Sequence, residues 1–79
     1  MGLSRGENEK MTKLPERLLA LRLEHGLSQK NLVKEMGFAL NTYVRYERGE
    51  REPDASALVR IADFYGVSID YLVGRSEER

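Results

Sequence analysis

Glycines that recur along the sequence limit what this 79-residue chain can fold into. They stand at Gly26, Gly37, Gly49, Gly66 and Gly74, at intervals of 8 to 17 residues. Each interval has room for one short helix. Glycine adopts the left-handed backbone conformation with which helices commonly end. The spacing therefore predicts a series of short helices joined by tight turns.

Apolar residues between these glycines recur at helical spacing. The four stripes comprise Leu14, Leu18 and Leu21; Leu32, Val33 and Met36; Leu58, Ile61, Ala62 and Tyr65; and Ile69, Leu72 and Val73. Ser28 and Ser68 are expected N-caps, and Pro53 and Asp54 open the fourth segment. No strand-like alternation persists. With the more polar segment 39–48, the pattern predicts five helices and the all-α class.

Composition excludes several classes of protein. The chain has no cysteine and one histidine, so neither a disulfide scaffold nor a zinc site fits, and we expect no metal and no cofactor. No apolar run approaches the roughly 18–20 residues of a membrane span. No nucleophile accompanied by a base and no phosphate-binding glycine loop are present. We therefore expect no catalytic residues and no enzyme activity.

The distribution of polar residues predicts the domain boundaries. Residues 1–12 contain almost no large apolar side chain and are expected to be a flexible extension. Residues 13–75 are expected to form one small domain, followed by a short polar tail at 76–79. The first segment lacks the apolar region of a signal peptide, so the expected location is the cytoplasm.

Charge is unevenly distributed, although lysine plus arginine and aspartate plus glutamate each number 13. Residues 26–49 carry four bases and two acids, whereas residues 50–79 carry four bases and seven acids. The middle of the chain is therefore basic and its last third acidic.

The basic middle segment has the spacing of a helix-turn-helix, with two short helices around a glycine turn. Gly37 permits the bend between them. The small core between the two helices is expected to contain Leu32, Met36, Phe38 and Tyr43. Ser28 would cap the first of these helices and direct its N-terminal amides, with Gln29 beside them, toward an anion such as a phosphate.

Five motifs follow one another along the chain. They are G-L-S-Q at 26–29, R-Y-E-R-G at 45–49, P-D at 53–54, I-A-D-F-Y-G-V-S at 61–68 and D-Y-L-V-G at 70–74. In this order and at these spacings they resemble the Cro/repressor-type (XRE) helix-turn-helix family. The resemblance implies a five-helix, lambda-repressor-like DNA-binding domain with a central helix-turn-helix. It also implies binding to operator DNA, usually as a two-fold dimer.

The resemblance further implies roles for individual residues. Base readout would fall to Leu40, Asn41, Val44 and Arg45. Phosphate contacts would fall to Ser28, Gln29, Thr42 and Arg48. An asparagine amide can pair with adenine and an arginine fork with guanine, each worth about 1–3 kcal/mol of discrimination. Arg22 in the first helix would pair with Glu47 at the end of the third and fix how that helix sits.

Three positions depart from the pattern of the family. Val33 stands where a small residue is usual, Ala39 where a hydroxyl cap is usual, and Tyr43 where isoleucine or valine is usual. Loss of a hydroxyl cap costs about 1 kcal/mol. We expect Tyr43 to be a core residue rather than a base-stacking one.

The predicted function is sequence-specific binding of double-stranded DNA by a transcriptional regulator, in particular a repressor that binds a palindromic operator as a homodimer. The alternative is a protein-interaction module, such as an antitoxin or a regulator that docks on a partner protein. Leu19 and Leu23 either widen the core or contact such a protein, and Tyr71 and Val73 are candidates for a dimer seam. Whether the chain is a minimal repressor or the N-terminal part of a protein with a further C-terminal domain stays open.

Overall fold

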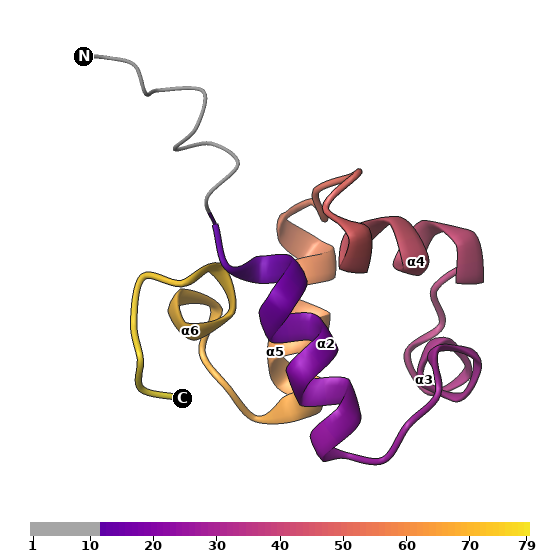
Figure 1. Ribbon diagram of the computed structural model, residues 1–79, viewed down its shortest axis with the longest axis horizontal. Coiled ribbons are helices and arrows are strands. Elements are labelled where there is room, and N and C mark those ends of the chain that lie inside the picture. Colours follow the sequence, from indigo (N-terminus) through magenta and orange to yellow (C-terminus); the bar gives the residue numbers. More distant parts are fainter. Residues whose placement is uncertain (1–11) are drawn as a thin grey trace.

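The computed structural model describes residues 12–79 and confirms the all-α class, with five helices and no strand in that range. In the labels of Figure 1 the helices are α2 (Leu14–Glu24), α3 (Gln29–Met36), α4 (Leu40–Arg48), α5 (Ala55–Tyr65) and α6 (Ile69–Val73). The predicted flexible extension, apart from Thr12, lies outside the described residues. None of the described helices is long and apolar enough to cross a membrane.

The helix ends follow the predicted signals. Four helices end at a glycine with positive φ, and Gly26, also with positive φ, follows the end of α2. At Gly37, φ is 79°, which lets the chain turn between α3 and α4 within three residues. The Ser28 hydroxyl accepts a hydrogen bond from the Asn31 amide at 3.0 Å, so it caps α3 as predicted. Ala39 provides no side-chain cap for α4, also as predicted.

The five helices enclose one hydrophobic core. Its largest fully buried side chains are Leu18, Leu21, Leu32, Tyr43, Ile61 and Leu72. Helix α2 packs against α4 and α6, and α3 packs against α4 and α5. Figure 1 shows α3 end-on and α4 running across the view, so these two helices cross steeply. The core therefore packs against one side of α4 and leaves the opposite side exposed to solvent.

The burial of three side chains bears on the alternatives given above for Leu19, Leu23 and Tyr71. Leu19 and Leu23 do not widen the core, because 42% and 61% of their surfaces are exposed. The buried stripe of α2 already occupies the side that faces α4 and α6. Tyr71 is buried within this chain beneath the guanidinium of Arg17, which lies 4.0 Å from its ring. A dimer seam at Tyr71 and Val73 stays a prediction.

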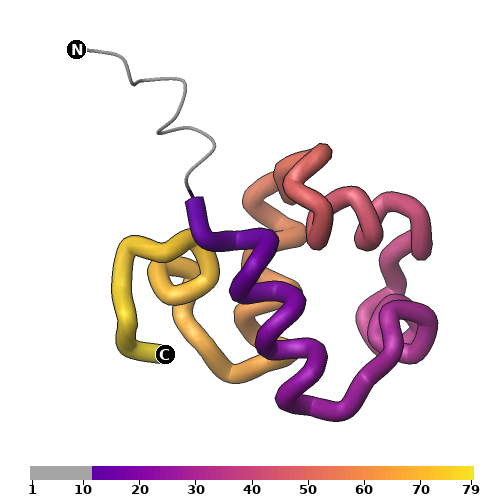
Figure 2. Tube along the Cα trace, viewed as in Figure 1, coloured from indigo at the N-terminus to yellow at the C-terminus, as the bar shows by residue number. Residues whose placement is uncertain are grey.

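The polar tail lies against the helices. The Arg17 guanidinium donates to the Ser76 carbonyl at 3.2 Å and to Glu77 at 3.1 Å. The Arg79 guanidinium donates to Glu24 at 2.9 Å, and the Arg79 carbonyl accepts from the Ser68 amide. Figure 2 shows this segment, in yellow, turning back from α6. These contacts join the tail to α2 and to the start of α6.

Candidate nucleic-acid interface

One side of α4 is exposed and carries all four predicted base-reading residues. At 3.6 residues per turn, Leu40, Asn41, Val44, Arg45 and Arg48 fall within an arc of about 140°. All of them are exposed except Val44, which is half-buried. Thr42 lies outside this arc and is half-buried. We call these five residues of the arc the α4 outer face.

The opposite side of α4 is fixed by aromatic packing. Tyr43 is fully buried, as predicted, and 6% of Tyr46 is exposed. The Phe38 ring stacks on the Tyr43 ring, with 6.4 Å between the ring centroids, and meets the Tyr46 ring edge-on, with 5.9 Å between the centroids. Such contacts favour one rotation of the helix about its axis. They therefore determine which residues form the α4 outer face.

Arg22 and Glu47 form the ion pair that the resemblance implied. The Arg22 Nε and Nη2 atoms donate to the two carboxylate oxygens of Glu47 at 2.7 and 3.1 Å. Only 12% and 6% of the two side chains are exposed. Arg22 Nη1 also donates to the Leu27 carbonyl at 2.9 Å. One guanidinium thus joins α2 to the end of α4 and to the turn before α3.

Two further side chains donate to Glu47. Gln29 Nε2 lies 3.1 Å from one carboxylate oxygen, and the Tyr43 hydroxyl lies 2.6 Å from the other. Burial pushes the pKa of Glu47 upward, but hydrogen bonds from Arg22, Tyr43 and Gln29 outweigh it and hold that pKa below its usual range. The carboxylate is therefore charged and internally satisfied, and it links α2, α3 and α4.

The predicted phosphate-binding residues lie in different surroundings, and Gln29 is the one that donates to Glu47. The amide nitrogen of Gln29 points to Glu47, and the Ser28 hydroxyl is occupied as the cap of α3. The contacts of Ser28, Gln29, Thr42 and Arg48 with phosphate stay predictions. Arg48 lies on the α4 outer face, with 66% of its side chain exposed.

Two buried tyrosines give a matched test of the network. The Tyr43 hydroxyl donates to Glu47, whereas the buried Tyr65 hydroxyl has no hydrogen-bond partner among the described residues. Burial raises the pKa of Tyr65 to about 12 and that of Tyr43 further. We expect Tyr43→Phe to lower the free energy of unfolding by about 1.5–3 kcal/mol, because a hydrogen bond to a charged group is lost. We expect Tyr65→Phe to be neutral or stabilising.

Thermal unfolding of both variants checks this prediction. A loss of 1 kcal/mol lowers Tm by roughly 4–8 °C in a domain of this size. Equal shifts in the two variants would contradict the assigned role of the Tyr43 hydroxyl.

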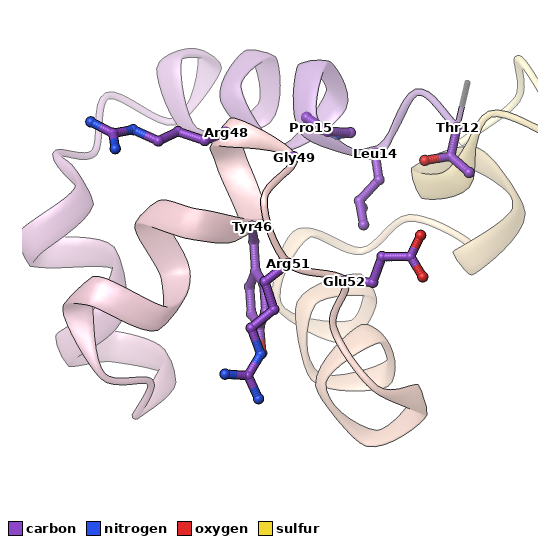
Figure 3. A pocket seen from close by; sticks show the side chains of 8 residues that line it. All are labelled: Thr12, Leu14, Pro15, Tyr46, Arg48, Gly49, Arg51 and Glu52. Carbon is purple, nitrogen blue, oxygen red and sulfur yellow. The ribbon is translucent and has the colours of Figure 1, made fainter. Parts of the chain in front are cut away.

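Arg51 was not among the residues predicted from the motifs. This exposed base lies in the loop after α4 and continues the three-residue spacing of Arg45 and Arg48, which is the signal that could have found it. Arg51 and Arg48 both line a pocket of about 490 Å³ between the start of α2 and the end of α4. In Figure 3 the Arg51 side chain lies along Tyr46, while Arg48 points away from it. The loop thus adds an exposed base after the end of α4, on the side of Tyr46 rather than on the α4 outer face.

The chemistry of this surface suits an anionic partner. Of the two acids in residues 26–49, Glu47 is paired inside the protein, so Glu35 is the acid of that segment left exposed. Within residues 12–79 no group of three or more potential ligands is placed to hold a metal. Exposed arginines beside an exposed amide are the side chains that contact phosphates and base edges.

Fold and site together define a helix-turn-helix protein. The chain matches the helix-turn-helix family over residues 18–72, and it belongs to that family, in its Cro/repressor (XRE) type. The predicted five-helix architecture with a central helix-turn-helix is confirmed.

Several curated proteins are similar to this chain. The HTH-type transcriptional regulator ImmR of Bacillus subtilis (strain 168) is 36% identical over 64 residues, which cover 81% of this chain and 50% of ImmR. The cryptic phage CTXphi transcriptional repressor RstR of Vibrio cholerae is 40% identical over 57 residues, covering 72% of this chain and 51% of RstR. The chain spans about half the length of these relatives. Both are named as regulators of transcription, in agreement with the prediction that this chain is not an enzyme.

Proposed function

We propose that this chain binds double-stranded DNA in a sequence-dependent way and regulates transcription by covering an operator. The observation that carries the proposal is the α4 outer face, which presents Asn41, Arg45 and Arg48 to solvent while its opposite side is buried. A helix of this kind fits the major groove, where each base pair presents a distinct pattern of donors and acceptors.

The Arg22–Glu47 pair supports this proposal. It lies behind the α4 outer face and holds α4 against α2 and α3 without using any exposed base. Arg45 and Arg48 therefore take no part in this buried network. A rigidly held helix loses little conformational entropy on binding.

The finer proposal is a repressor that binds as a homodimer. A two-fold dimer would present two copies of α4 to half-sites about 34 Å apart, one turn of the duplex. The name of RstR as a transcriptional repressor supports the direction of regulation. The operator would then be an inverted repeat.

Selection from a random duplex pool tests the proposal. The purified chain is incubated with the pool at about physiological salt, and the retained duplexes are sequenced. We expect an enriched motif with two inverted halves. A single enriched half would contradict the dimer but keep the DNA-binding function, whereas the absence of any retained duplex would contradict that function.

A second candidate function is docking on a protein partner. Leu19 and Leu23 lie one turn apart on α2 and are exposed, as a protein contact would require. This surface is separate from the α4 outer face. Failure to retain DNA, together with stoichiometric binding of a partner that Leu23→Asp abolishes, would favour this function instead.

A further inference from the structure

Glu50 lies directly after the end of α4, and its carboxylate faces two of the bases that the proposed function assigns to DNA. One carboxylate oxygen is 3.9 Å from Nε of Arg45, and the other is 3.8 Å from Nη1 of Arg48. More than half of each of these three side chains is exposed. A single negative charge thus lies between two exposed guanidinium groups.

The end of the helix fixes the place of this carboxylate. Gly49 has φ of 75° and ends α4 in the left-handed conformation. The backbone amide of Glu50 then donates to the Arg45 carbonyl at 2.9 Å. This bond is the one that closes a Schellman motif, so Glu50 belongs to the helix end rather than to a free loop.

Glu50 differs from the neighbouring acids Glu47 and Glu52 in the charged groups that it faces. Glu47 is buried and paired with Arg22, so its charge is neutralised inside the protein. Glu52 is exposed but makes no ion pair with another residue of 12–79. Glu50 is therefore the acid that acts on Arg45 and Arg48.

We propose that Glu50 sets the discrimination between the operator and other DNA by competing with phosphates for Arg45 and Arg48. This inference rests on the proposed function. On unrelated DNA, both arginines gain only contacts with phosphates, which carry no sequence information. The Glu50 carboxylate offers both guanidinium groups a comparable partner and also repels the phosphates.

On the operator the balance differs. There Arg45 gains a bidentate contact with a guanine edge, which a carboxylate 3.9 Å away does not match. Glu50 therefore weakens binding to unrelated DNA more than binding to the operator. A repulsive group that penalises the wrong partner is a general means of achieving specificity.

Equilibrium binding of Glu50→Gln tests this proposal, with Glu52→Gln as the control that removes the same charge two residues away. The probes are a duplex recovered by selection and a random-sequence duplex, each titrated over about 50 to 200 mM salt. Glu50→Gln should raise affinity for the random duplex by about three- to tenfold and affinity for the selected duplex less. For Glu50→Gln, the fall in affinity for the random duplex with rising salt should steepen by the amount that about one additional phosphate contact gives, or by more. Glu52→Gln should change both affinities by less than twofold, roughly the effect of an exposed, unpaired charge.

The outcomes separate this inference from the proposed function. Equal gains on both duplexes, or equal gains from Glu52→Gln, would overturn the inference alone, because net charge would then explain them. A smaller gain from Glu50→Gln in an Arg48→Ala background would support the pairing. Failure of the wild-type chain to bind either duplex would overturn the proposed function and this inference with it.

Discussion

We expect Arg22→Met to lower the free energy of unfolding by about 3–5 kcal/mol, because it leaves a buried carboxylate without its cationic partner. Glu47 would keep its hydrogen bonds from Gln29 and Tyr43, but only 6% of its side chain reaches solvent. Small domains are commonly stable by about 5–15 kcal/mol, so the loss would bring the variant close to unfolding at ordinary temperature. Urea unfolding followed by circular dichroism measures the change.

The double variant Arg22→Met, Glu47→Met is the control. Replacing both charges with apolar side chains of similar length removes the uncompensated charge. We expect the double variant to be more stable than Arg22→Met, although Tyr43 and Gln29 lose an acceptor. If the double variant were less stable than Arg22→Met, a role of the pair in ordinary packing would replace the electrostatic explanation.

The loss of stability in Arg22→Met should depend on pH. The pKa of Glu47 is lowered in the folded chain, so its contribution is present above the unfolded value of about 4.3. That contribution is lost as the pH falls through the folded pKa. Without Arg22, burial dominates and the carboxylate takes up its proton closer to neutrality. The stability gap between wild type and Arg22→Met should therefore narrow from pH 7 to pH 4.

Local rules explain which parts of the fold were predictable. Gly37 and Gly49 signal helix ends through backbone freedom, and Ser28 signals a helix start through its hydroxyl, so each acts within a few residues. Tyr43 lies at helical spacing from other apolar residues, which correctly indicated its burial.

Contacts between distant segments were less predictable. The amide of Gln29 turns to Glu47, 18 residues away, because folding brings the start of α3 beside the end of α4. Tyr71 is covered by Arg17 from a helix 54 residues earlier in the chain. Leu19 and Leu23 have apolar side chains at helical spacing, yet the core of α2 is complete without them. The spacing of apolar residues shows which of them share one face of a helix, but not what that face packs against.

The second large effect is expected at Arg45, where Arg45→Ala should remove discrimination at one base pair in each half-site. A bidentate arginine contact with guanine is worth about 1–3 kcal/mol against the wrong base, or about 5- to 150-fold in affinity. Arg45 is suited to that contact because it lies on the α4 outer face with 54% of its side chain exposed. The backbone of α4 and the buried Tyr46 should be unaffected by its removal.

Gln29→Ala is the matched comparison at the start of α3. If Gln29 contributes to phosphate binding, its loss should weaken binding to all sequences alike and leave the preference among them unchanged. Gln29 also donates to Glu47, so its loss can lower stability as well as affinity. Thermal unfolding of Gln29→Ala is therefore measured in parallel to separate the two effects.

Direct readout of DNA sequence by α4 is tested with a panel of operator variants, each changed at one base pair. The affinity of each duplex is measured for wild type, Arg45→Ala and Gln29→Ala. The predicted result is a flat profile for Arg45→Ala at one position of each half-site and a uniformly lowered but parallel profile for Gln29→Ala. Uniform weakening by Arg45→Ala, with every base preference retained, would contradict direct readout by the α4 outer face.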